Sequence, residues 1–331
     1  MIYDTLDIAL ICGKIAVIFL VVLVIAAYLV LAERVLLGRI QERYGPNRVG
    51  PFGLLQPLAD GIKMLVKEDV KPAGADKWLF YLAPAMSAIP AIMMVSLIPF
   101  GEPVTLFGRR VELQVVDLNV GLLLFFGFSA IAVYGVALGG WASNSKYSLL
   151  GSIRGLAQMI SYEITLGLSL VPVVMLARSF QLTEIVRAQE SGWFILYQPL
   201  AFLIFLISIV AESRRIPFDI PEAEGELVAG YHTEYSGLRF GLYFVGEYIN
   251  MIVLGGLAAT FFLGGWQGPL LPPVVWFLVK ALFFSVLFIW LRGTLPRLRY
   301  DQLMHLCWKI LTPLALLNIL ATGWFILLVK G

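Results

Sequence analysis

The chain has 331 residues, of which 60% are hydrophobic and 14% are charged, and its formal net charge is +2. Soluble domains usually carry about 25% charged residues, so this composition, with a mean hydropathy of +0.86, excludes an ordinary soluble enzyme or nucleic-acid-binding domain. It predicts an all-α, polytopic integral membrane protein. Cys12, Cys307, His232 and His305 are isolated from one another along the chain, so they predict neither a disulfide framework nor a metal site.

Apolar segments recur along the whole sequence, and each is close to the roughly 20 residues that a helix needs to cross a bilayer. We therefore predict about eight transmembrane helices in a single domain, 1–331. The N-terminus lacks the basic region of a cleaved signal peptide, so the first segment is expected to remain as a helix. The expected helices cover 12–32, 78–100, 118–140, 156–177, 193–211, 240–263, 274–291 and 310–329.

Lysine and arginine are distributed unevenly between the connecting loops. Seventeen lie in the loops 33–77, 141–155, 212–239 and 292–309, and four lie in the loops on the other side. Because basic loops stay in the cytoplasm, we predict that both termini face the outside. The absence of a long organelle-specific extension is consistent with a bacterial plasma membrane.

The first basic loop, 33–77, is too long to be a simple connection. Gly45-Pro46 and Gly50-Pro51 interrupt any helix there. Beyond them, apolar residues return at helical spacing from Leu54 to Leu65, which predicts an amphipathic helix lying along the membrane interface. Such a helix is either an ordinary surface helix anchored in the headgroups or the rim of an opening in the membrane.

The most polar segment of the C-terminal half, 212–237, places six acids beside Arg214 and Arg215. Asp219 and Glu222 fit a capping box that would simply start a short helix. Alternatively, the acids line a polar chamber at the membrane surface, where repulsion between neighbouring carboxylates raises the pKa of at least one of them. The six acids are Glu212, Asp219, Glu222, Glu224, Glu226 and Glu234.

Two further acids fall inside expected helices. Glu163 and Glu247 each lie about eight residues from the cytoplasmic side, roughly 12 Å deep at ~1.5 Å per residue, and Glu212 closes the expected helix 193–211. Intramembrane carboxylates usually serve an ion or proton path. The alternative for each acid is a structural hydrogen bond to a neighbouring helix. Lys280, nearer the outer face, either snorkels outward or pairs with a carboxylate.

Three long motifs carry a family resemblance that spans nearly the whole chain. They are P-F-D-I-P-E-A-E-G-E-L-V-A-G-Y-H-T-E-Y-S-G at 217–237, G-R-I-Q-E-R-Y-G-P-N-R-V-G-P-F-G-L-L-Q-P-L-A-D-G-I-K at 38–63, and G-W-A-S-N-S-K-Y-S-L-L-G-S-I-R at 140–154. The chain resembles the H-subunit family. Members of this family are membrane subunits of NADH-quinone oxidoreductase, which is respiratory complex I.

The resemblance implies a membrane subunit that forms part of a quinone chamber and couples quinone reduction to proton translocation. It implies a proton path through Glu163, Glu212 and Glu247. The quinone, ubiquinone or menaquinone, is a substrate. Four arginines, Arg34, Arg43, Arg48 and Arg215, would hold the chamber acids ionised between turnovers. The expected chamber residues are Arg34, Gln41, Arg43, Arg48, Asp60, Arg215, Phe218, Asp219, Glu222, Glu224 and Glu226.

No redox centre is expected in this chain, because it has no cysteine cluster, haem ligand pair or nucleotide fingerprint. The resemblance therefore implies that FMN, NADH and the iron–sulfur clusters belong to partner subunits. The expected partners are peripheral-arm subunits at the cytoplasmic face, antiporter-like and small membrane subunits, and lipid, with no nucleic acid.

Two other functions remain open at this point. A related membrane subunit of an energy-converting hydrogenase would share the ancestry without using quinone in the same way. A secondary transporter would show repeated halves and paired broken helices, and no internal repeat is visible in the sequence. Within the family, some relatives accept electrons from ferredoxin or another carrier instead of NADH.

Overall fold

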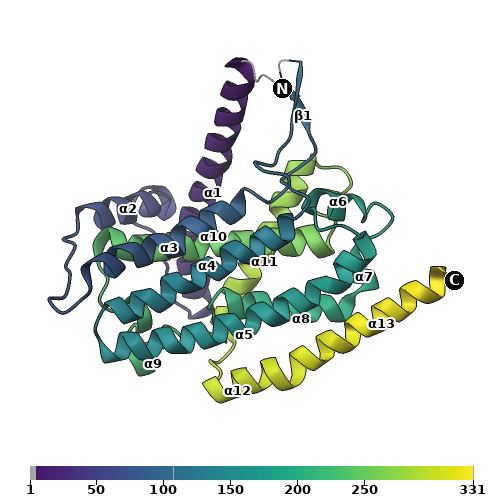
Figure 1. Ribbon diagram of the computed structural model, residues 1–331. Helices are drawn as coiled ribbons and strands as arrows, with labels where there is room; N and C mark the ends of the chain where they lie inside the picture. The colour runs from purple at the N-terminus through teal and green to yellow at the C-terminus, as the bar shows by residue number, and fades with distance from the viewer. Residues whose placement is uncertain (1–4, 107, 331) are drawn as a thin grey trace.

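A computed structural model describes residues 5–106 and 108–330 (Figure 1). The regular secondary structure of the described part is helical except for one two-stranded antiparallel hairpin. In chain order the elements are α1 Thr5–Ile40, η1 Pro51–Gly53, α2 Gln56–Val66, α3 Lys77–Val95, β1 Val104–Leu106, β2 Arg109–Val111, α4 Gly121–Ala142, α5 Lys146–Ala177, α6 Leu182–Arg187, α7 Phe194–Tyr197, α8 Pro199–Glu212, α9 Glu224–Leu227, η2 Gly230–His232, α10 Gly237–Phe262, α11 Pro273–Thr294, α12 Tyr300–His305, the π-helical turn η3 Leu306–Leu311, and α13 Thr312–Lys330.

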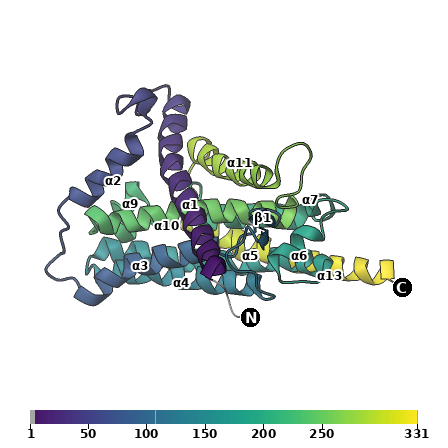
Figure 2. The same cartoon turned by 90° about the horizontal axis from the view of Figure 1, so that it is seen from above.

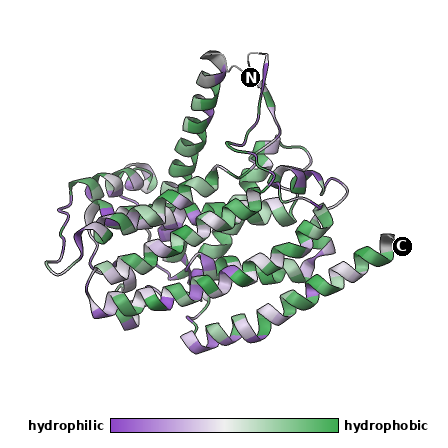
Figure 3. Cartoon of the chain, in the orientation of Figure 1, coloured by the Kyte–Doolittle hydropathy of each residue, from purple (hydrophilic) through white to green (hydrophobic). Residues whose placement is uncertain are grey.

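Helix α10 is the most buried of the long helices that the structure describes. Helix α3 packs against α4 and α10, α5 against α4 and α8, and α11 against α10. Helix α1 crosses this group steeply, and α13 runs along its opposite edge (Figures 1 and 2). Close approach needs small residues: a Cβ on Gly255 of α10 would lie 2.7 Å from the backbone oxygen of Ala281 on α11. Hydrophobic residues predominate along the long helices, and hydrophilic residues are frequent in the connecting segments (Figure 3).

Seven helices of the described chain are long and apolar enough to span a membrane, which confirms a multi-pass membrane protein. The expected count of about eight is not confirmed. The expected helix 193–211 is broken after Tyr197, and the 14-residue α8 is only about 21 Å long at ~1.5 Å per residue. Gln198 interrupts the helix there, with its side chain bonded to Thr322 and Asn318 of α13.

Three sequence-based boundaries are corrected by the structure. Helix α1 does not end near residue 32 but continues to Ile40, which places Glu33 inside a helix. Helix α5 begins at Lys146, so most of the expected loop 141–155 is helical. The expected capping box at Asp219 is absent, because α9 begins only at Glu224 and Ala223 precedes it.

Helix α2 is the amphipathic helix expected in the first loop. None of its residues is buried in the chain, and Leu58, Ile62 and Leu65 are more than half exposed. An apolar face of this kind is stable only against hydrocarbon or another protein, so α2 fits an interfacial position.

Candidate functional site

Two arginines follow directly after α8 and turn into the bundle. Arg214 adopts a left-handed backbone conformation (φ 55°), and Arg214 and Arg215 are 5% and 3% exposed. The Nη1 of Arg215 donates to both carboxylate oxygens of Glu33, at 2.8 and 2.9 Å. Its Nε lies 3.0 Å from Oε1 of Glu247 on α10. One guanidinium therefore joins acids from two helices.

Glu33 is the most heavily bonded acid of this site. The hydroxyl of Tyr248 donates to its Oε2 at 2.7 Å, and Arg292 of α11 forms an ion pair with its Oε1. The ring of Tyr248 also lies beneath the guanidinium of Arg215, 4.7 Å from its Cζ. We call this set of residues the Arg215 cluster: Glu33, Arg215, Glu247, Tyr248 and Arg292.

The charges of the Arg215 cluster balance as two carboxylates and two guanidinium groups. Burial alone would lower the pKa of Arg215, but Glu247 and Glu33 together raise it well above its usual value. Buried charges are tolerated only when they are paired in this way. The shared guanidinium of Arg215 therefore holds the cluster together.

A second group of acids adjoins the Arg215 cluster. Nη2 of Arg297 donates to Asp219 at 2.9 Å. Burial nevertheless raises the pKa of Asp219, against the opposing effect of Arg297. Burial and the charge of Asp219 likewise raise the pKa of Glu222, whose carboxylate lies 3.9 Å from Nδ1 of His232. These two carboxyls hold protons more readily than exposed ones.

Arg214 bridges this region to the acid that ends α8. Its Nη1 donates to the hydroxyl of Tyr231 at 2.8 Å, and its charge lies within electrostatic range of Glu212, Glu222 and Glu247. Glu212 accepts a hydrogen bond from Ser129 of α4 at 3.2 Å and is within range of Glu163 on α5. Arg214 is thus within electrostatic range of Glu247 and Glu212, and Glu212 is within range of Glu163.

The loop between these groups is fixed by Gln158 of α5. Its side-chain amide donates to the backbone oxygens of Ala211 and Phe218, both at 2.8 Å. Phe218, an expected chamber residue, is buried with its ring 5.5 Å from that of Tyr162. It packs in the protein core and so supports the loop.

Several buried polar atoms here have no hydrogen-bond partner within the described chain. Room for water or for a rearranged proton is the usual reason for such atoms in a native protein. They include Oε1 of Gln158, Oε2 of Glu212, Nε of Arg214, Nη2 of Arg215, Oδ1 of Asp219 and Nε of Arg297.

A cavity of about 160 Å³ lies between α1, α2 and α10, and its lining is almost entirely apolar. It shares Arg34, Asp60 and Met64 with a second, more polar cavity of about 310 Å³. Nη1 of Arg34 donates to Asp60 at 2.6 Å, and Gln56 donates to the other oxygen of Asp60 at 2.9 Å. This ion pair stands where the two cavities meet.

Tyr248 connects the apolar cavity to the Arg215 cluster, because it lines the cavity while its hydroxyl binds Glu33. Glu33 and Arg34 are adjacent on α1, so their side chains point about 100° apart. Glu33 of the Arg215 cluster and Arg34 of the cavity lining therefore come from a single turn of α1.

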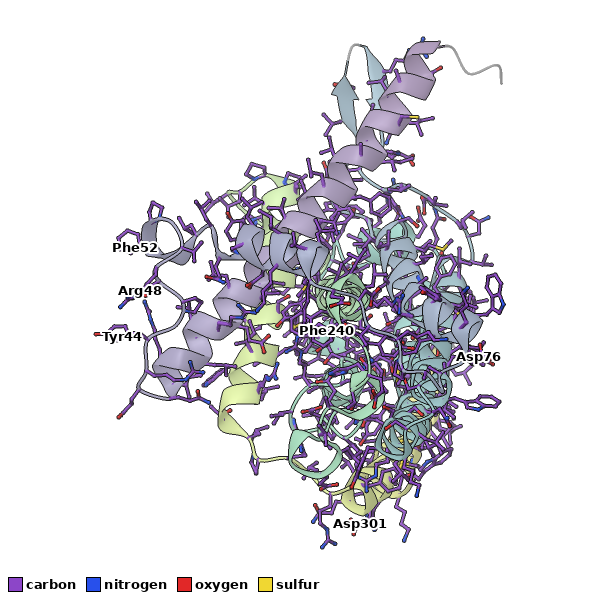
Figure 4. The ribbon with its side chains drawn as sticks, turned by 90° about the vertical axis from the view of Figure 1, so that its left-hand side faces the viewer. Tyr44, Arg48, Phe52, Asp76, Phe240 and Asp301 are labelled. Atoms are coloured by element: carbon purple, nitrogen blue, oxygen red, sulfur yellow. The ribbon has the colours of Figure 1, made fainter. Side chains whose placement is uncertain are left out.

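Other expected chamber residues lie elsewhere. Arg43 donates to Gln41 at 2.8 Å, and these two side chains and Arg48 are exposed. Figure 4 shows Arg48 with Tyr44 at the edge of the molecule, apart from Phe240 near its centre. Arg43 and Arg48 therefore do not hold the chamber acids ionised in this structure, contrary to the expectation from the sequence.

The remaining acids of the polar segment are also separated from the Arg215 cluster. Glu226 is exposed and pairs with Arg154 of α5 at 2.6 Å. The side chain of Glu224 lies outside the described part of the chain. Across residues 5–106 and 108–330, no group of three or more His, Cys, Asp or Glu side chains is placed to hold a metal ion.

Comparison with known proteins decides the family. A family model described as NADH dehydrogenase matches residues 13–323. The NADH-quinone oxidoreductase H subunit numbered 2 in Geobacter sulfurreducens is 76% identical, over 98% of both chains. The H subunits numbered 2 in Syntrophobacter fumaroxidans and Rhizobium meliloti are 64% and 51% identical, over 95% of both chains and over 94% and 95% respectively. The chain belongs to the H-subunit family of NADH-quinone oxidoreductase.

Membership of the H-subunit family confirms the resemblance carried by the three sequence motifs. It makes the chain a membrane subunit of complex I, a multi-subunit oxidoreductase, and not a transporter or part of a hydrogenase. Seven apolar helices agree with that place in the membrane.

The sequence interpretation missed three residues that the structure places at or beside the centre of the site. They are Glu33, Arg292 and Arg297. The apolar run ends before Glu33, which favours a loop there, although an acid directly after an apolar run can still be helical. In the sequence, Arg292 and Arg297 contribute only to the predicted orientation of the chain in the membrane. Their acidic partners are distant along the chain.

Proposed function

We propose that quinone approaches through the apolar cavity between α1, α2 and α10, and that its reduction changes the protonation of the acids around the Arg215 cluster. The observation that carries this proposal is the position of Tyr248. Its ring lines a cavity suited to an apolar tail, and its hydroxyl binds the central acid Glu33. An event in the cavity is thereby one hydrogen bond from a buried network of charges.

The polar cavity beyond the Arg34–Asp60 ion pair would receive the quinone headgroup. Arg34 and Asp60 supply a donor and an acceptor there, and both are partly exposed, at 43% and 22% of the side chain. An ion pair at such a surface contributes little stability. It can therefore open without a large cost when a headgroup passes.

The quinone gains two electrons and two protons on reduction. Electrons would come from iron–sulfur clusters of peripheral subunits docked at the basic face of this chain, which we assign to the cytoplasmic side of a bacterial plasma membrane with both termini outside. Negative charge that develops in the polar cavity would act through Tyr248 and Glu33 on the Arg215 cluster and would favour the protonated forms of Asp219 and Glu222 beside it. That change would act through Arg214 and Arg215 on Glu247, Glu212 and Glu163, and then on antiporter-like subunits.

Photolabelling of the intact complex tests the route. A quinone-headgroup inhibitor carrying an aryl azide is bound, illuminated and located by peptide mass spectrometry. We expect labels within 56–67 or 236–248, and we expect excess quinone to prevent them. The matched control is the outer hairpin 104–111, which should stay unlabelled. Labels confined to other subunits would contradict the proposed route.

A further inference from the structure

An ion pair outside the Arg215 cluster joins the start of α10 to the segment after α2. Nε of Arg239 lies 2.9 Å from Oδ2 of Asp69, and the Arg239 side chain is only 11% exposed. Its guanidinium stacks on the ring of Tyr81 of α3, with Cζ 3.9 Å from the ring centroid, and lies 5.3 Å from that of Phe80. Stacking and ion pairing together make Arg239 better fixed than an ordinary surface arginine.

Ser236 and Gly237, just before Arg239, contact the same segment after α2. The hydroxyl of Ser236 donates to the oxygen of Glu68 at 3.2 Å and accepts from the amide of Val70 at 3.3 Å. Gly237 has a φ of 54°, and a Cβ there would lie 3.0 Å from the oxygen of Lys67. Only glycine fits this conformation and this approach without strain. We call Ser236, Gly237 and Arg239 the α10 clamp.

The α10 clamp holds a helix that has few other contacts. Helix α2 buries none of its residues, and its C-cap Lys67 lies directly against the clamp. Met64, one turn earlier, packs on Gly241, where a Cβ would lie 2.9 Å from its Sδ. Met64, Lys67, Ser236 and Gly237 also line the polar cavity. The clamp therefore sits at one wall of that cavity and α2 at the other.

We propose that Arg239 is a positioning residue that sets the separation of α2 from α10 and thereby the access of quinone to the polar cavity. This inference rests on the proposed quinone route. Arg239 is not a lining residue of either cavity, so its effect passes through Asp69 and the 67–70 backbone. Loss of the clamp should weaken quinone binding and leave the chemical step unchanged.

The functional test uses Arg239→Met in the intact complex, with a short-chain quinone as the varied substrate. We expect the KM to rise about fivefold and kcat to stay within about twofold, as for loss of a half-buried, stacked ion pair. Asp69→Asn, at a more exposed position, should give a smaller rise in KM. Arg239→Lys keeps the charge without the planar stacking, so its KM should fall between those of Arg239→Met and the unchanged protein.

A double-mutant cycle separates the ion pair from general damage. The KM of the Arg239→Met, Asp69→Asn double variant should be close to that of Arg239→Met alone, because each change removes the same ion pair. The matched control is Arg187→Met, which removes the exposed ion pair with Glu184 on α6. That variant should keep the KM of the unchanged protein.

A disulfide reports the position of α2 directly, without any activity. In a Met64→Cys, Gly241→Cys protein the two Cβ atoms lie 3.8 Å apart, within the ~3.5–4.5 Å that a disulfide needs. Cys12 is exposed and is replaced by serine, whereas Cys307 is buried and is kept. Under mild oxidation of the complex in membranes, we expect Arg239→Met to slow formation of this disulfide severalfold, measured by mass spectrometry of the linked peptides.

The two readouts separate the inference from the proposed function. Unchanged disulfide formation in Arg239→Met would overturn the inference, whatever happens to the KM. Slower disulfide formation with an unchanged KM would also overturn it, because α2 would then move without affecting quinone. In that second case the photolabelling experiment decides whether the quinone route itself is wrong. A raised KM together with a slowed disulfide supports the inference.

Discussion

The two halves of α10 use buried polar groups in different ways. The N-terminal half, which we call the Arg215 end, contributes Glu247 and Tyr248 to the Arg215 cluster, and several polar atoms around that cluster have no partner within the described chain. At the other end Lys280 of α11 donates to three backbone oxygens, those of Leu263, Gly265 and Gln267, at 2.6 to 3.0 Å. The partners there are peptide groups, which do not titrate.

The Lys280 end is also complete in its hydrogen bonds. The side chain of Gln189 donates to the oxygens of Ile185 and Thr260 and accepts from the amides of Phe194 and Gly264. Fully satisfied buried networks rigidify a structure, whereas partly satisfied ones leave room for rearrangement. The Lys280 end is therefore suited to closing the bundle, whereas the Arg215 end is suited to rearranging its hydrogen bonds.

The largest expected effect comes from removing the shared guanidinium of the Arg215 end. Arg215→Met leaves Glu33 and Glu247 short of a cation, and breaking a buried pair costs ~3–5 kcal/mol. We expect little of the chain in purified complex, measured by quantitative mass spectrometry of the subunits. Arg187→Met, which breaks only the exposed ion pair with Glu184, is the control and should assemble normally. Normal assembly of Arg215→Met would contradict the importance of the cluster.

A smaller, purely structural effect is expected at the other end. Lys280→Met leaves three backbone oxygens without their donor, at a cost of ~1–3 kcal/mol. The melting temperature of the complex should fall, while quinone turnover per assembled complex stays the same. If turnover were lost at an unchanged melting temperature, Lys280 would belong to the mechanism and the contrast between the two ends would be wrong.

Amide substitutions sharpen the contrast within the Arg215 end. Glu247→Gln, Glu212→Gln and Glu163→Gln keep the shape of each side chain but remove its proton exchange. Losing a proton-carrying group should reduce coupled turnover about tenfold or more, with assembly preserved. Proton uptake and electron flow are measured together in vesicles. Normal proton-to-electron stoichiometry in these variants would remove the acids from the proton path.

The smallest effect is a pH dependence of stability. The pKa values of Asp219 and Glu222 are raised, so the folded chain binds protons more tightly than the unfolded chain, whose values are ~3.9 and ~4.3. Their stabilisation is present below those values and is lost as pH rises through the folded pKa. Asp219→Asn with Glu222→Gln should therefore lose less stability between acidic and neutral pH. A thermal melt at several pH values checks this, and parallel curves would contradict it.

Hydropathy predicted most of the fold because crossing a bilayer requires long apolar segments, and these are visible in one sequence. It failed where a charge lies within a helix: Glu33 is tolerated in α1 only because Arg215 and Arg292 pair with it. Nothing local to residue 33 reveals those partners. The break at Gln198 does have a local cause, because Pro199 follows it and disfavours the helical conformation at the preceding residue.

The site was also predictable only in part, because some of its contacts join residues that are distant along the chain. Motif and burial arguments identified Arg215, Asp219, Glu222 and the intramembrane acids, which the structure brings within electrostatic range of one another. They could not separate Arg34, which lines the cavities, from Arg48, which is exposed. Both arginines lie in the same expected basic loop, so the sequence does not distinguish them. The packing of α2 on α10 does, because only Arg34 lies beside it.

The central claim is that the acids at the Arg215 end change protonation when quinone is reduced. Redox-induced infrared difference spectroscopy of the intact complex measures this directly, through the carbonyl band of a protonated carboxyl. We predict that such a band appears on quinone reduction and is altered in Asp219→Asn and in Glu247→Gln. Glu190→Gln, which changes an exposed acid near the Lys280 end, should leave the band unchanged. Identical difference spectra in all these proteins would contradict the claim.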